Sequence, residues 1–147
     1  MYFRGRSRHA LDSKGRLAIP SRFREVLDQR REDCLVVTNK DGCLWSFTRE
    51  DWRVLEEKAA NLPLFDEAGI VFLRYFMSGA VECPLKNGRI TIPLALREDA
   101  GLKKEVMVLG HLKRFEIWDK DKWENDELVR IREEFPQASQ ALSELKI

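Results

Sequence analysis

The sequence has little of what marks a metal protein, a disulfide-linked secreted protein or a membrane protein. Its three cysteines, Cys34, Cys43 and Cys83, are odd in number and show no C-x-x-C spacing. The sequence therefore predicts buried free thiols rather than a disulfide framework or a zinc site. No apolar run approaches the roughly 18 residues of a membrane span, and no signal-peptide pattern is visible. We expect a cytoplasmic protein that binds no metal and no membrane.

Catalytic patterns are scarce as well. The sequence has no phosphate-binding glycine loop, and no cysteine–histidine or paired-acid arrangement that suggests an active site. His9 and His111 stand far apart without partner ligands, so we interpret them as structural. The sequence therefore predicts a protein that is not an enzyme and that uses no cofactor and no small-molecule substrate.

Positive charge is concentrated near the N-terminus, although the formal net charge of the chain is only +1. Residues 1–24 contain seven Lys and Arg side chains and one acid, Asp12, which gives this segment +6 and leaves −5 for the rest. Arg4, Arg6 and Arg8 occupy every second position, so an extended chain would place them on one side, about 6.6 Å apart. That interval is close to two base-pair rises of DNA. A DNA-facing arm and a charged edge strand that prevents aggregation both fit this pattern.

Two similar segments, HALDSKGRLAIP from His9 and CPLKNGRITIP from Cys83, indicate that the chain contains two copies of one unit. Each has a glycine turn followed by arginine, alternating apolar residues and proline, which predicts a hairpin. One copy cannot close a barrel, but two can shield each other's strand edges. We therefore predict an α+β fold, a pseudo-dimer of interleaved hairpins in one small β-barrel with attached helices.

The pattern of elements divides the chain into a first repeat, connecting helices, a second repeat and a C-terminal helix with a tail, at residues 1–54, 55–79, 80–126 and 127–147. A helix over about residues 66–78 is apolar nearly all round, which indicates burial between the copies or, preferably, a subunit interface. The last helix is expected to begin at Asp119 and to be interrupted at Pro136.

The motifs Phe3-Arg4-Gly5, His9, Leu11-Asp12, Lys14-Gly15-Arg16, Ile19-Pro20 and Phe23-Arg24 resemble the signature of the MraZ family. The resemblance covers essentially the whole chain and implies an AbrB/SpoVT-like swapped-hairpin barrel. It also implies a bacterial transcriptional regulator that forms rings on repeated DNA sites upstream of division and cell-wall genes, including its own, and so associates with the nucleoid. The family carries an Asp-x-x-x-Arg motif in each repeat; here the second repeat has Leu85 in place of the acid.

The candidate DNA-binding residues are those of the two turns and the basic arm: Arg4, Arg6, Arg8, Lys14, Gly15, Arg16, Arg22, Arg24, Lys86, Asn87, Gly88 and Arg89. Arg16 and Arg89 at hairpin tips suit bidentate contact with guanine in a major groove. Lys14 suits a phosphate, as a flexible point charge. Asp12 would repel phosphate and is interpreted as turn-stabilising, and a local Asp12–Arg16 turn pair remains the structural alternative.

One other function class remains open, a protein-interaction module, because related barrels serve as antitoxins. An antitoxin would be expected to follow its barrel with a long disordered tail. In this sequence most of the length after Arg24 has the periodicity of packed structure and includes a second barrel half. We therefore prefer the DNA-binding homo-oligomer.

Overall fold

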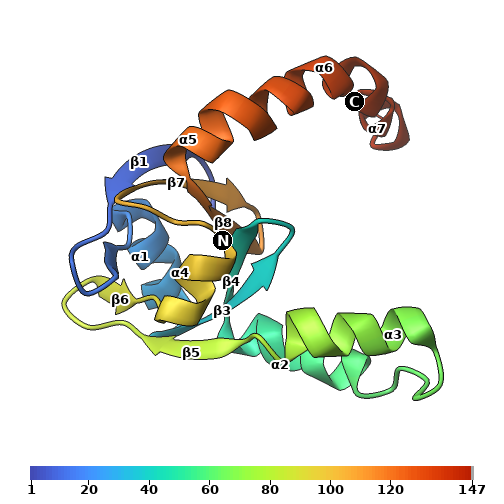
Figure 1. Cartoon of the computed structure of the whole chain (residues 1–147), viewed down its shortest axis with the longest axis horizontal. Helices are drawn as coiled ribbons and strands as arrows, with labels where there is room; N and C mark the ends of the chain where they lie inside the picture. Colours follow the sequence, from blue (N-terminus) through green and yellow to red (C-terminus); the bar gives the residue numbers. More distant parts are fainter. Residues whose placement is uncertain (147) are drawn as a thin grey trace.

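The computed structural model describes residues 1–146, in which strands of the two copies combine into antiparallel sheets (Figure 1). The strands are β1 (Arg6–Ala10), β2 (Arg16–Ala18), β3 (Cys34–Lys40), β4 (Cys43–Thr48), β5 (Val81–Pro84), β6 (Arg89–Thr91), β7 (Glu105–His111) and β8 (Arg114–Asp119). The helices are α1 (Ser21–Gln29), α2 (Arg49–Ala59), α3 (Glu67–Phe72), η1 (Leu73–Met77), α4 (Leu94–Asp99), α5 (Lys120–Lys122), η2 (Trp123–Glu127), α6 (Leu128–Ala138) and α7 (Gln140–Glu144), where η marks a π-helical turn. The predicted α+β class is confirmed.

Strands of the first copy pair with strands of the second throughout the molecule. One sheet has the order β1-β7-β8-β4-β3-β5, and a separate two-stranded sheet joins β2 to β6. The pairs β1–β7, β4–β8, β3–β5 and β2–β6 each join one copy to the other. The two copies therefore share their sheets and cannot form independent domains.

This pairing corrects one local prediction. The sequence suggested a hairpin over residues 11–19, but β2 pairs with β6 of the other copy instead of with the strand before its own turn. The reason is burial: Leu17 at the centre of β2 and Ile90 at the centre of β6 face each other in the ladder and are 0% and 1% exposed. The predicted hairpin over residues 34–47 does form, as β3 and β4, around Asp41 and Gly42 with positive φ.

The core joins segments that are distant in sequence. Phe3, Phe23 and Phe115 are fully buried, and their ring centroids lie 5.0–5.2 Å apart. Phe3 also pairs with the backbone of Leu112, exchanging hydrogen bonds of 2.7 and 3.0 Å. The N-terminal arm is therefore part of the core rather than a free extension. Cys34, Cys43 and Cys83 are buried free thiols, as predicted.

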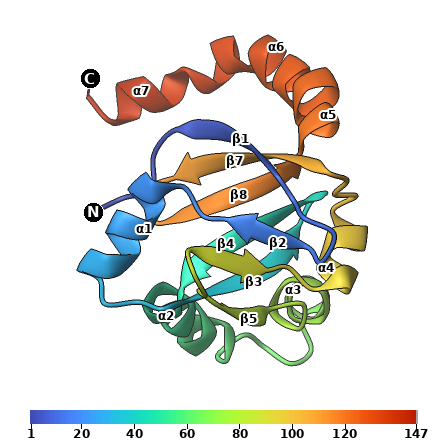
Figure 2. The same cartoon turned by 90° about the vertical axis from the view of Figure 1, so that its left-hand side faces the viewer.

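Helices form two arms at opposite ends of the large sheet, as both ribbon views show (Figures 1 and 2). One arm consists of α2, α3 and η1, and the other of α5, η2, α6 and α7. Side chains cap their first helices, because Thr48 accepts from Asp51 N at 3.1 Å and Asp119 accepts from Lys122 N at 3.2 Å. Pro136 does not end α6, which continues to Ala138. No helix within residues 1–146 has the length and apolar character needed to span a membrane.

Candidate nucleic-acid interface

Strands β2 and β6 form a narrow ribbon with one polar and one buried face. Arg16 lies opposite Thr91, and Ala18 lies opposite Arg89. These four residues share the outer face, because the middle residue of each strand is buried in the core. The arginines of the two copies therefore stand on the same face, at opposite ends of the ribbon. We call this face, with the turns at residues 12–15 and 86–88, the arginine ribbon.

Asp12 fixes the first turn of the arginine ribbon. Its Oδ1 accepts hydrogen bonds from the backbone N–H groups of Lys14 and Arg16, both at 2.9 Å, and its Oδ2 accepts from Arg16 Nε at 2.5 Å. Gly15 donates to the Asp12 carbonyl at 3.0 Å and has a φ of +78°, a conformation that suits glycine. The hydrogen bond from the Arg16 backbone is the main cause that lowers the pKa of Asp12 to about 2. Asp12 therefore stays charged at neutral pH.

The second turn closes without an acid. Asn87 and Gly88 have φ values of +52° and +74°, as in the tight hairpin turns that favour Asn-Gly. Lys86 and Arg89 exchange backbone hydrogen bonds of 2.8 and 3.0 Å. Leu85, at the position that matches Asp12, is partly buried and packs against the core. The side chain of Arg89 consequently has no acid within its own turn.

The two turns are connected across the copies. Ile19 N donates to the Gly88 carbonyl and Ile92 N donates to the Gly15 carbonyl, both at 2.9 Å. Each turn glycine is therefore held by the isoleucine that ends the strand of the other copy. Asp12 extends this connection, because its Oδ2 lies 3.9 Å from Arg89 Nη1.

Arg24 and Arg97 are equivalent in the two copies and make equivalent contacts. Each donates through Nε to the carbonyl of the isoleucine five residues earlier, at 3.2 and 2.9 Å. Each also crosses the turn glycine of the other copy: Arg24 lies over Gly88 and Arg97 lies over Gly15. A Cβ added to Gly15 would stand 2.5 Å from Arg97 Nε. The stems of these two arginines thus brace the ribbon.

The remaining basic residues of the N-terminal segment lie outside the arginine ribbon, on β1, α1 and the residues before β1. Arg6 and Arg8 are exposed on the same face of β1, and Gly5, with a φ of +90°, separates Arg4 from this strand. Arg8 donates to Glu124 of η2 at 3.1 Å, which directs it toward the C-terminal helices. Arg22 donates to the Arg4 carbonyl at 2.8 Å and to Ser7 Oγ at 3.1 Å, so it fastens the arm to α1.

The relationship of this chain to known proteins follows from its sequence as well. The family model described as "MraZ protein, putative antitoxin-like" matches residues 2–74 and 76–144. The chain belongs to the MraZ family. The MraZ model thus matches the chain twice, once over each of the two copies inferred from the sequence.

Curated MraZ relatives cover most of the chain. The "Transcriptional regulator MraZ" of Ligilactobacillus salivarius is 48% identical over 124 residues, covering 83% of this chain and 84% of the relative. That of Syntrophobacter fumaroxidans is 47% identical over 124 residues, covering 84% and 83%. That of Alkaliphilus metalliredigens is 48% identical over 122 residues, covering 82% and 83%. The resemblance noted in the sequence is confirmed.

Sequence reasoning missed three cations that lie near the first turn in this MraZ family member. Arg97, Lys103 and Lys104 line a hollow together with Asp12 and its neighbours. A hydrogen bond of 2.8 Å from Leu11 N to the Lys104 carbonyl brings the two segments together. The equivalence of Arg97 to Arg24, one of the candidate residues, was the available signal for the first of them. The two lysines carried none, because their segment lies about ninety positions along the chain from the turn it meets.

Proposed function

We propose that this MraZ family member is a sequence-specific DNA-binding transcriptional regulator that reads DNA with the arginine ribbon. The observation that carries the proposal is the pair Arg16 and Arg89 on the outer face of a two-stranded element. A two-stranded β-ribbon fits the major groove of B-DNA, and an arginine there can bond the O6 and N7 atoms of guanine. The relatives named as transcriptional regulators support the same class of function.

The other cations have a different part in this proposal. Lys14 and Lys86 lie at the tips of the turns and are exposed, so they would contact phosphates beside the groove. Lys103 and Lys104 extend the same basic surface behind the first turn. Phosphate contacts position a protein on DNA and supply affinity, while base contacts supply specificity.

We infer that the two sheets together form the swapped-hairpin barrel of the AbrB/SpoVT type, with repeats at residues 1–54 and 80–126. The reciprocal bonds between Ile19 and Gly88 and between Ile92 and Gly15 support this inference, since each copy supplies the strand that closes the turn of the other.

The targets in this proposal are repeated sites upstream of the division and cell-wall gene cluster, including the protein's own promoter. They rest on the resemblance to the family. A homo-oligomer would place several arginine ribbons on several repeats at once and would act in the cytoplasm, on the nucleoid. Tethered contacts combine by effective concentration, so weak single contacts can add to tight binding.

The proposal is tested by titrating the protein against duplexes from the DNA upstream of its own gene over a salt series. Affinity should fall with a log–log slope of about −0.9 for each neutralised phosphate, and a duplex with several repeats should bind far more tightly than one with a single repeat. A scrambled duplex of equal length is the control. Absence of binding at low salt, or equal affinity for native and scrambled DNA, would refute the regulator.

A further inference from the structure

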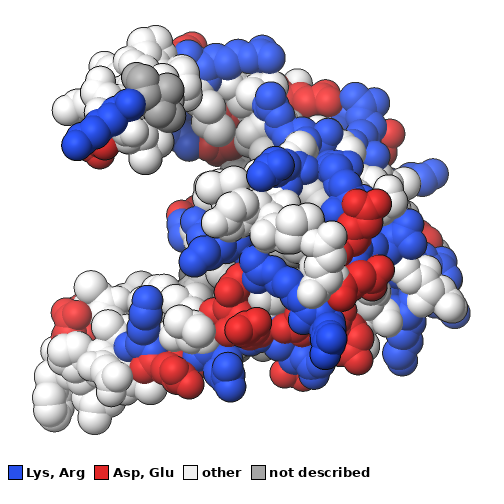
Figure 3. Space-filling view, turned by 180° about the vertical axis from the view of Figure 1, so that it is seen from behind, with Lys and Arg blue, Asp and Glu red and all other residues white. Residues whose placement is uncertain are grey.

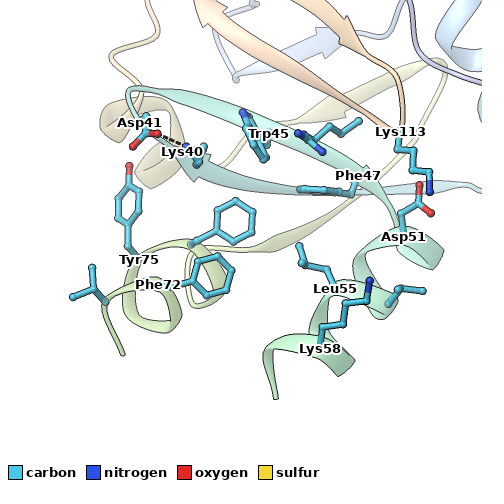
Figure 4. Close-up of a pocket in the computed structure, with 14 residues that line it drawn as sticks. Lys40, Asp41, Trp45, Phe47, Asp51, Leu55, Lys58, Phe72, Tyr75 and Lys113 are labelled. Carbon is cyan, nitrogen blue, oxygen red and sulfur yellow. Dashed lines mark hydrogen bonds and ion pairs between the residues drawn. The ribbon is translucent and has the colours of Figure 1, made fainter. Parts of the chain in front are cut away.

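A large open groove lies between the α2–α3–η1 arm and the large sheet (Figure 4). Its volume is about 670 Å³, within the range of about 300–1,000 Å³ that is usual for small-molecule sites. Seen from behind, this arm projects from the sheet beside an open hollow (Figure 3). The lining side chains on which the argument depends are Trp45, Phe47, Lys58, Phe72, Lys113 and Arg114. We call it the aromatic groove.

The aromatic groove is on the face of the large sheet that points away from the arginine ribbon. Phe47 and Arg114 are opposite each other in the β4–β8 ladder, so their side chains share one face. Leu44 and Phe115, which point to the other face, belong to the core that also contains Leu17 of the ribbon. A molecule in the groove would therefore leave the arginine ribbon free.

The walls of the aromatic groove are apolar along most of its length. Trp45 and Phe47 come from β4, and Phe72 at the end of α3 stacks on Phe76 of η1 with 5.1 Å between the ring centroids. Val71 on α3 also lines the groove and is 55% exposed, so apolar surface remains in contact with water. Removing such surface from water is favourable. These walls therefore suit an extended apolar body.

A partly buried arginine in the aromatic groove has unused hydrogen-bonding capacity. The Arg114 guanidinium lies 4.1 Å from the centre of the Trp45 ring, and burial lowers the pKa of Arg114 from its ordinary value. Its Nε atom is buried and has no hydrogen-bond acceptor within residues 1–146. Glu116, two residues along β8, instead accepts from Trp118 Nε1 at 2.8 Å. A buried donor without a partner requires an explanation, and an acceptor on a bound molecule supplies one.

Two lysines add to the positive charge of the groove. Lys58 from α2 and Lys113 from the turn between β7 and β8 stand on the same side of the groove as Asp51 (Figure 4). Within the described part of the chain, neither lysine nor Arg114 forms an ion pair. Asp51 pairs with Arg30 at 2.9 Å, so its charge is already compensated. The groove therefore presents three cations that lack an anion.

The opposite side of the groove has no such excess of charge. Lys40 and Asp41 form an ion pair there, beside Tyr75 (Figure 4). The Tyr75 hydroxyl donates to Asp99 Oδ2 at 2.8 Å and is thus already bonded. The groove is therefore polarised, with unpaired cations on one side, aromatic walls between, and a neutral pair on the other side.

We propose that the aromatic groove binds an amphiphilic anion, a small molecule that carries one carboxylate or phosphate group on an extended apolar body. Lys58, Lys113 and Arg114 contact the anionic group, and the body lies along the aromatic walls. Arginine bonds carboxylate and phosphate oxygens strongly. An uncharged ligand would leave the three cations without an anion, and a polyanion such as a nucleic acid would place charge against apolar walls, which is costly.

The test is isothermal titration calorimetry of the full-length protein with decanoate, decyl phosphate and decanol, each below the concentration at which it forms micelles. The three probes share one apolar chain. Decanoate and decyl phosphate differ in the anionic group, so their affinities show which group the site prefers, and decanol lacks the charge. We expect one anion to bind per chain, far more tightly than decanol. Acetate and inorganic phosphate, which lack the apolar body, should give no detectable binding.

Variants locate the site. Arg114→Gln should weaken binding of the tighter anion about tenfold or more, because a hydrogen bond to a charged group is lost, and Arg53→Gln, which removes the same charge from α2 outside the groove, should not. Val71→Asp should weaken binding by placing an acid in the groove, whereas Ala68→Asp adds the same charge on α3 outside the lining and should leave affinity unchanged. Far-ultraviolet circular dichroism shows that each variant is folded, and Lys113→Gln repeats the charge test if Arg114→Gln does not fold.

Several results would overturn the site. They are the absence of binding by either anion, equal affinity for decanol and the anions, and uptake of many anions per chain, which is adsorption of a detergent. Equal losses for Arg114→Gln and Arg53→Gln would also overturn it, because the effect would then be one of overall charge. The titration uses no DNA, and Arg114→Gln should leave affinity for the duplex unchanged, so this inference and the proposed function can fail separately.

Discussion

Substitution of Arg16 by alanine is the sharpest test of the arginine ribbon, because this guanidinium is ordered before DNA arrives. Asp12 holds its Nε at 2.5 Å. No other hydrogen bond to this guanidinium is present within residues 1–146, so both terminal nitrogens are free for the bidentate contact with guanine. The loss on Arg16→Ala should be that of one such contact, about 1–3 kcal/mol, or roughly 5–150-fold in affinity for the specific site.

Arg89 provides the comparison within the same molecule. Its nearest acid is Asp12, with Nη1 at 3.9 Å from Oδ2, which is longer than a hydrogen bond. Its side chain must therefore be ordered when DNA binds, at a cost of about 0.5–1.5 kcal/mol. Arg89→Ala should accordingly lose about 2–12-fold less affinity than Arg16→Ala.

The assay is fluorescence anisotropy with a duplex that carries a single repeat, so that effective concentration does not hide the loss. Specific and scrambled duplexes are titrated at one salt concentration. Arg53→Ala, an exposed cation on α2 far from the ribbon, controls for the loss of one charge. Equal losses for Arg16→Ala and Arg89→Ala would refute the argument from preorganisation. An Arg16→Ala protein that does not fold would show that the Asp12–Arg16 pair is structural.

Three further predictions follow from the same geometry. Lys14→Ala should weaken binding to specific and scrambled DNA alike and lower the salt slope by about one, and a loss confined to the specific duplex would contradict a phosphate contact. The pKa of Asp12 is about 2 against the usual 3.8, so this carboxylate contributes stability above about pH 5 and loses that contribution as pH falls toward 2. In urea titrations the difference in the free energy of unfolding between wild type and Asp12→Asn should therefore be constant from pH 7 to about pH 5 and shrink below it. A difference that does not change with pH would be the contrary result. Ile90 is 1% exposed, so Ile90→Ala should lower the free energy of unfolding by about 2–5 kcal/mol. Thr91→Ala, on the outer face of the ribbon, should change it by less than about 0.5 kcal/mol. Similar losses for the two variants would argue against burial of the inner face of the ribbon.

Local chemistry made much of this protein predictable from its sequence. Glycine and Asn-Gly turns, alternating strands and the cap residue Thr48 act over a few positions, so they appear directly in the order of residues. The same holds for the duplication and for the family signature. These signals were enough to predict an α+β fold of two interleaved repeats and to select Arg16 and Arg89 as equivalent residues of two turns.

Tertiary structure alone decided which strands pair and where the cations of the arm lie. A strand of three residues such as β2 can pair with either neighbour, and the choice of β6 depends on burying Leu17 with Ile90, a contact between residues more than seventy positions apart. For the same reason the sequence could not show that Arg8 contacts Glu124, that Arg97 crosses Gly15, or that the two helical arms lie at opposite ends of the sheet. Packing between distant segments fixes each of these arrangements, whereas the sequence records directly only what neighbouring residues do to one another.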